Sequence, residues 1–102
     1  MNRALLLGAA LALGTAAAGV AHAQDVIRIG APLPITGPLS PEAKKQQRGY
    51  DLWAETANKS GGVKVGAKRM KVEIVYVDYQ SNTPRAVQSA EKLSTQDNVS
   101  FL

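Results

Sequence analysis

Four residues in one short segment could bind a small polar molecule by non-covalent contacts. Thr36 and Ser40 offer hydroxyl groups for hydrogen bonds. Leu39 offers an apolar wall, and Glu42 carries a carboxylate that could meet an ammonium group. The segment follows a mostly apolar run that ends at Ala31, and in open parallel sheets ligands bind beyond the carboxyl ends of the strands. It is therefore the best candidate for a ligand site.

Each of these residues also has an ordinary structural role to weigh. Ser40 precedes Pro41, and a serine at this position is expected to cap a helix because its side chain accepts from the first free amides. Glu42 is expected to be a surface charge near the positive end of that helix. For Thr36 and Leu39, the choice between ligand contact and plain loop stays open.

The residues of common catalytic and metal sites are scarce. The sequence has no Cys, and its one His, His22, lies before the expected start of the mature chain. A thiolate metal site and a disulfide are therefore excluded, and the commonest general base is missing. Residues 62–68 superficially resemble a phosphate-binding loop, but the glycine spacing is wrong and a strand follows. We expect no enzyme, no catalytic residue, no metal and no cofactor.

The charge balance is modestly basic. Twelve Lys and Arg against eight Asp and Glu give a net charge of +4. Four of the basic residues gather in one stretch, namely Lys64, Lys68, Arg69 and Lys71. No aromatic residues alternate with them, as a surface for stacking nucleic-acid bases requires. We interpret the stretch as a solvated connection and expect no nucleic-acid partner.

Residues 1–23 are typical of a secretory signal peptide. Arg3 precedes an uncharged run rich in Ala and Leu, and the run leads into an A-x-A cleavage motif. Cleavage is expected between Ala23 and Gln24, which leaves a soluble mature domain of residues 24–102. The alternative is a transmembrane anchor, which fits less well because the run is short for a membrane span and rich in Ala and Gly.

The mature sequence begins with a strand, a stiff loop and a helix. Residues 26–31 are mostly apolar and β-branched, which is typical of a buried strand. Five prolines and glycines fix the shape of the loop over residues 32–41. A helix is expected to follow and to end at Gly61-Gly62, with Asp51 and other charged residues pointing away from the sheet. The face expected to pack on the sheet comprises Ala43, Gly49, Tyr50, Trp53 and Ala57.

A second strand and a second helix come next. Residues 63–68 are expected to form a polar connection, and Met70–Asp78 an edge strand of a parallel sheet. Asp78 and Ser81 are expected to form the following turn or to cap a helix end. Thr83-Pro84 is expected to begin the helix as Ser40-Pro41 begins the first. The face expected to pack comprises Ala86, Val87, Ala90, Leu93 and Ser94.

Residues 99–102 are expected to begin a third strand in which the sequence stops. Strand, helix, strand, helix, strand is the order of right-handed parallel crossovers with helices on the faces of a sheet. The predicted fold class is therefore α/β, with a parallel β-α-β-α-β arrangement.

Together these motifs resemble a known family in order and spacing. The matching segments are IRIG at 27–30, PITGPLS at 34–40, Gly49, Leu52 and Asn58 with Gly61-Gly62, VEIVYVD at 72–78, Gln80-Ser81 and RAVQSAEKL at 85–93. They resemble the type I periplasmic solute-binding proteins, in particular the branch that binds leucine, isoleucine and valine for ABC importers. Two departures exist: Asp78-Tyr79 stands where the family often has two acidic residues, and Trp53 stands where a small residue is more usual. The tryptophan indicates a sub-branch.

The resemblance implies a two-lobed Venus-flytrap protein whose lobes close on a small ligand such as an amino acid or an analogue. It implies a periplasmic location and a membrane permease as partner. Residues 24–102 are then expected to form the N-terminal part of the first lobe, with most ligand-gripping groups in loops beyond Leu102. An alternative with the same fold is a ligand-sensing domain of a receptor or regulator.

Overall fold

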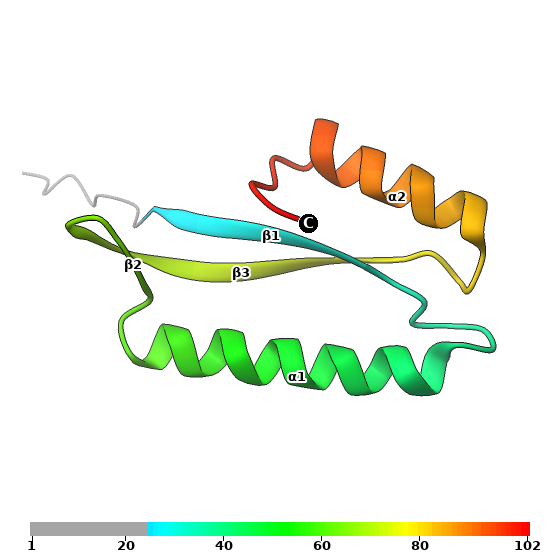
Figure 1. Ribbon diagram of the computed structural model, residues 1–102, viewed down its shortest axis with the longest axis horizontal. Coiled ribbons are helices and arrows are strands. Elements are labelled where there is room, and N and C mark those ends of the chain that lie inside the picture. Colours follow the sequence, from blue (N-terminus) through cyan, green and yellow to red (C-terminus); the bar gives the residue numbers. More distant parts are fainter. Residues whose placement is uncertain (1–24) are drawn as a thin grey trace, which may run out of the picture.

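A computed structural model describes residues 25–102 of the protein (Figure 1). The predicted signal peptide and its cleavage site between Ala23 and Gln24 lie outside the described residues. In chain order the elements are β1 (Val26–Leu33), α1 (Ser40–Lys59), β2 (Val63–Val65), β3 (Lys68–Asp78) and α2 (Thr83–Thr95). Within residues 25–102, neither helix is long and apolar enough to cross a membrane.

The sheet is built around β1 and β3, which pair in parallel with residues 26–33 opposite residues 71–78. β2 pairs antiparallel with the beginning of β3, so the strand order is β1-β3-β2. On the other edge of β1, a parallel bridge joins Ile29 to Phe101. The bridge lies within the third strand predicted for residues 99–102. The predicted α/β class is confirmed.

The prediction of a plain connection over residues 63–68 is wrong. Val63–Val65 forms β2, which pairs with Lys68–Met70 as a short hairpin. Gly62 before β2 and Gly66 after it have φ angles of +99° and +61°, a region that glycine enters without strain. The rest of β3 pairs only with β1 among the described residues, so the edge-strand prediction is confirmed for that part.

Helix α1 packs on β3 with a face that only partly matches the predicted one. Ala43 is buried, whereas a methyl group added at Gly49 would meet nothing within 4 Å. Asp51, predicted to point away, accepts a hydrogen bond of 2.6 Å from the hydroxyl of Tyr76 on β3. Burial, with the Asp51 contact adding to it, raises the pKa of the Tyr76 hydroxyl above its usual value, so the hydroxyl keeps its proton and stays a donor. Trp53, also predicted for the packed face, is about half exposed.

Asn58 joins the end of α1 to the free edge of β3. Its side-chain amide donates to the carbonyl oxygen of Val72, and its side-chain oxygen accepts from the N–H of Val72, both at 2.8 Å. One side chain thus supplies the bonds that a neighbouring strand would supply, which protects an otherwise open edge. The helix then ends as predicted at Gly61-Gly62, where the N–H of Gly62 donates to the carbonyl of Ala57 at 2.9 Å.

We expect Asn58→Ala to lower the free energy of unfolding by about 2–3 kcal/mol, because both polar groups of the buried Val72 backbone lose their partner. Urea denaturation of the purified protein measures this change. Gln46→Ala on the exposed side of the same helix is the control, and a change within about 0.5 kcal/mol is expected there. Equal effects of the two variants would contradict the role of Asn58.

Helix α2 covers the opposite face of the sheet from α1 (Figure 1). Leu93 is fully buried, whereas Val87, predicted for the same face, is exposed. The expectation that Thr83 caps the helix is wrong, because Asn82 accepts the hydrogen bond from the N–H of Arg85 at 3.1 Å. A cap residue flanks the first helical residue. Thr83 is already the first residue of α2, so the cap position falls to Asn82, whose side-chain oxygen reaches the N–H of Arg85.

Candidate functional site

The loop after β1 is joined to the end of β3 by the carboxylate of Asp78. The hydroxyl of Thr36 donates to Asp78 Oδ2 at 2.7 Å, and the N–H of Thr36 donates to Oδ1 at 3.2 Å. The same Oδ1 accepts from the N–H of Gln80 at 2.8 Å. The hydrogen bond from the Thr36 hydroxyl is the main cause that lowers the pKa of Asp78 below its usual value, so the carboxylate is an anion at neutral pH.

Ser81 makes a second connection between the same two loops. Its hydroxyl donates to the carbonyl oxygen of Thr36 at 2.9 Å and accepts from the N–H of Leu39 at 3.1 Å. Gly37 lies beneath this hydroxyl, and a Cβ added there would come within 2.7 Å of Ser81 Oγ. We call the set Thr36, Leu39, Asp78 and Ser81 the loop clasp. It lies where the parallel strands β1 and β3 end.

The structure places the four predicted site residues in two groups. Thr36 and Leu39 belong to the loop clasp, and the side chain of Leu39 is about half exposed. Ser40 and Glu42 lie in the first turn of α1, outside the clasp. Glu42 accepts from Lys45 at 3.0 Å in an exposed ion pair, as expected for a surface charge.

The expectation that Ser40 caps α1 is wrong. Ser40 is already the first residue of the helix, Leu39 holds the cap position, and no side chain makes a cap hydrogen bond there. The N–H of Ser40 donates instead to the carbonyl of Gly37 at 3.0 Å. The positive φ of Gly37 makes a tight turn that starts the helix one residue earlier than a serine cap would.

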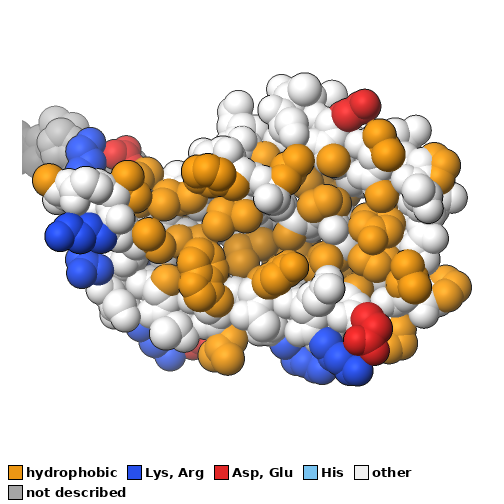
Figure 2. All heavy atoms as spheres, in the orientation of Figure 1, with side chains coloured by type: hydrophobic (Ala, Val, Ile, Leu, Met, Phe, Trp, Pro, Cys, Tyr) orange, Lys and Arg blue, Asp and Glu red, His pale blue; other side chains and the backbone are white. Residues whose placement is uncertain are grey.

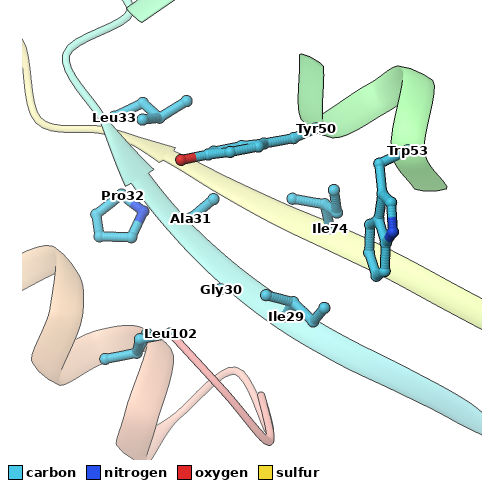
Figure 3. Close-up of a pocket in the computed structure, with 9 residues that line it drawn as sticks. All are labelled: Ile29, Gly30, Ala31, Pro32, Leu33, Tyr50, Trp53, Ile74 and Leu102. Atoms are coloured by element: carbon cyan, nitrogen blue, oxygen red, sulfur yellow. The ribbon is translucent and has the colours of Figure 1, made fainter. Parts of the chain in front are cut away.

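A second candidate is an apolar groove of about 290 Å³ between α1 and β1 (Figure 3). Tyr50 and Trp53 project from α1 over the sheet, and Leu102 lies across β1 from them. The remaining lining residues are Ile29, Gly30, Ala31, Pro32, Leu33 and Ile74. No charged side chain lines it, and Figure 2 shows the apolar side chains gathered on this face. The groove therefore suits packing better than recognition of a polar ligand.

The described residues offer no metal site. Among residues 25–102, no group of three or more His, Cys, Asp or Glu side chains is placed to hold an ion. The loop clasp itself contains one carboxylate, two backbone N–H groups and two hydroxyls, a set that binds by hydrogen bonds. This arrangement can hold the loop of Thr36 and Leu39 in place, so that the exposed surface of that loop is available to a small molecule.

Comparison with known proteins identifies the family. Residues 26–102 match the family described as periplasmic binding protein, so the chain belongs to this family. The prediction made from the motifs is confirmed, and the family is one of binding proteins.

Two solved structures resemble the chain with a TM-score of 0.67 each. One is the branched-chain amino acid transporter substrate binding protein LivJ from Streptococcus pneumoniae in complex with isoleucine, which is 28% identical over 74% of this chain. The other, from Silicibacter pomeroyi, carries a provisional assignment as a branched-chain amino acid ABC transporter and is 34% identical over 76% of this chain. The chain spans only 20% and 19% of the lengths of these two proteins.

Sequence reasoning underrated two residues of the loop clasp. Asp78 and Ser81 were expected to serve the turn after β3 or to cap a helix, and Asp78 does bond to the N–H of Gln80 in that turn. Their contacts with Thr36 cross 42 to 45 positions of sequence. The available signal was their position, since the ends of neighbouring parallel strands meet at one edge of a sheet.

Proposed function

We propose that the protein is the periplasmic substrate-binding component of an ABC importer for branched-chain or related amino acids. The observation that supports this most is the family match over residues 26–102. The relative from Streptococcus pneumoniae, a substrate binding protein of a branched-chain amino acid transporter, was solved with isoleucine. A membrane permease is the proposed partner, and residues 1–23 are the proposed signal peptide that directs the chain to the periplasm.

The proposed mechanism follows from the two-lobed architecture. Residues 24–102 would supply the beginning of one lobe, and the loop of Thr36, Leu39, Ser40 and Glu42 would form part of that lobe's ligand-facing surface. A ligand that binds the closed form more tightly than the open form shifts the population toward closure. The permease can then distinguish loaded from empty protein by its shape, and no bond in the ligand has to be made or broken.

The test begins with the secreted protein captured from a periplasmic extract of its source and analysed by intact mass. We expect a start at Gln24 and a chain about five times as long as the present one, given the 20% share of the relative's length. Calorimetry with isoleucine, leucine and valine should then show binding, with glucose as the negative control. A C-terminal membrane helix in the intact protein would favour a sensor, and no amino-acid binding would overturn the proposal.

A further inference from the structure

We propose that Asp78 and Ser81 are positioning residues that fix the ligand loop in one conformation before any ligand binds. The inference rests on the proposed function, because it assigns the loop of Thr36 and Leu39 to the ligand-facing surface. The inference goes beyond the proposed function because Asp78 and Ser81 lie at and after the end of β3, and they shape this surface without touching the ligand.

The first support is the number and direction of the contacts. Asp78 binds the hydroxyl and the N–H of Thr36, at 2.7 Å and 3.2 Å. Ser81 binds the carbonyl of Thr36 at 2.9 Å and the N–H of Leu39 at 3.1 Å. Four hydrogen bonds therefore hold the first and the last residue of the segment 36–39, and three of them engage backbone groups of the loop.

The second support is the backbone conformation at the clasp. Gln80 and Ser81 both lie in the left-handed region, with φ angles of +56° and +57°, and Gly37 on the opposing loop has a φ of +89°. Such conformations are uncommon for residues other than glycine and persist where surrounding contacts enforce them. Here the enforcing contacts are those of Asp78 with the N–H of Gln80 and of the Ser81 hydroxyl with the other loop.

The third support is the electrostatic setting of Asp78. Arg85 and Lys92 line an open hollow beside it, yet Arg85 contacts Gln80 and Lys92 pairs with Asp97 at 3.0 Å. Within residues 25–102, Asp78 makes no ion pair. Its charge is therefore stabilised by the donors of the loop, and hydrogen bonds to an ionised acceptor are stronger than neutral ones.

A consequence for Thr36 follows from the direction of its hydrogen bond. The hydroxyl proton points to Asp78, so this hydroxyl can act on a ligand only as an acceptor. The exposed side chain of Leu39 and the loop backbone are then the groups that the clasp presents. A loop fixed in advance loses less conformational entropy on binding, which strengthens affinity without a new contact.

The test uses the full-length secreted protein with four substitutions and one control. Asp78→Asn removes the charge and one acceptor, Ser81→Ala removes the second connection, and Thr36→Val removes the hydroxyl while keeping the shape. Thr36→Ser retains the hydroxyl and is the rescue variant. Glu91→Gln, an exposed carboxylate on α2, is the charge-matched control.

We expect Asp78→Asn, Ser81→Ala and Thr36→Val each to raise the Kd for isoleucine roughly tenfold, the effect of losing one hydrogen bond to a charged or buried group. Thr36→Ser should recover most of the affinity lost in Thr36→Val, and Glu91→Gln should bind as the wild type does. The double variant Thr36→Val/Asp78→Asn should be no weaker than the weaker single variant, because both remove the same contact. Hydrogen exchange of the Thr36 and Gln80 amides should accelerate in Asp78→Asn, and that of the Leu39 amide in Ser81→Ala, while the melting temperature changes little.

Additive losses in the double variant would overturn the proposal, because Thr36 would then contact the ligand directly. Unchanged amide exchange in both Asp78→Asn and Ser81→Ala would overturn it too, since the clasp would not be fixing the loop. If the wild-type protein binds no amino acid, the proposed function fails, and the amide-exchange comparison still decides whether the clasp positions the loop. If Asp78→Asn fails to fold, the proposal is tested by the Kd values of Ser81→Ala, Thr36→Val and Thr36→Ser and by amide exchange in Ser81→Ala.

Discussion

Replacing Gly62 with valine should lower the free energy of unfolding by at least about 3 kcal/mol, the combined cost of a strained backbone and a steric clash. The φ angle of Gly62 is +99°, which side chains rarely allow. A Cβ built on it would lie 2.3 Å from the carbonyl oxygen and 2.6 Å from the carbonyl carbon of Met70. These are backbone atoms of the β2–β3 hairpin, so no side-chain rotation can relieve the contact.

Gly49 offers a matched control in the same protein. It lies inside α1 with open space around the missing side chain, so Gly49→Ala should raise stability by about 0.5–1 kcal/mol. Urea denaturation followed by circular dichroism measures both variants. If Gly62→Val unfolds at the same urea concentration as the wild type, the close approach of Gly62 to Met70 is wrong.

Leu93→Ala should lower the free energy of unfolding by about 2–5 kcal/mol, as is typical for removing a fully buried leucine. Leu93 is 0% exposed and lies on the face of α2 that packs against β1. Its Cδ1 would lie 3.1 Å from a Cβ added at Gly30, so helix and strand are in close contact at this point. The cavity left by alanine would remove much of the apolar contact that fixes α2 on its face of the sheet.

Val87→Ala is the control for this prediction, because it makes a comparable truncation on the same helix at a side chain that is 57% exposed. It should change stability by no more than about 0.5 kcal/mol. Differential scanning calorimetry of the two variants tests the contrast. A cost for Val87→Ala as large as that for Leu93→Ala would show that α2 packs on the sheet by another face.

The elements that carry local signals could be predicted from the sequence. The β-branched run of β1, the proline after each helix start and the Gly61-Gly62 helix end all lie where expected. The third strand was predicted from residues 99–102 alone, and the Ile29–Phe101 bridge lies within it. These features depend on the backbone preferences of a few neighbouring residues, which sequence contains directly.

The packing faces of the helices could not be predicted with the same success. On α1, apolar spacing favoured Gly49, which faces open space, and did not reveal that Asp51 and Asn58 bond to β3. Periodicity counts apolar residues and ignores a polar residue that has a partner across the fold. β2 was not predicted for a related reason. A three-residue strand is stabilised by its pairing with β3, which its own residues do not indicate.

The position of the candidate loop in the fold could be predicted from the sequence, but the contacts that hold the loop in place could not. The rule that ligand loops follow parallel strands led to Thr36 and Leu39, and both lie in the loop between β1 and α1. The rule does not say which residues of the next strand end hold such a loop. Asp78 and Ser81 are polar residues in a turn, and only the parallel register of β1 with β3 brings them against Thr36.

The pairing of β1 sets the order in which the chain can fold. The two helices and the β2–β3 hairpin use contacts between near neighbours and can form within microseconds. β1 meets its first partner 45 positions later, as the pairing of Val26 with Lys71 shows, and its second 72 positions later, through Ile29 and Phe101. Distant pairings of this kind slow folding, because closing a long loop costs conformational entropy before the stabilising contacts form. β1, the first of the described elements to be synthesised, is therefore the last to be flanked on both edges.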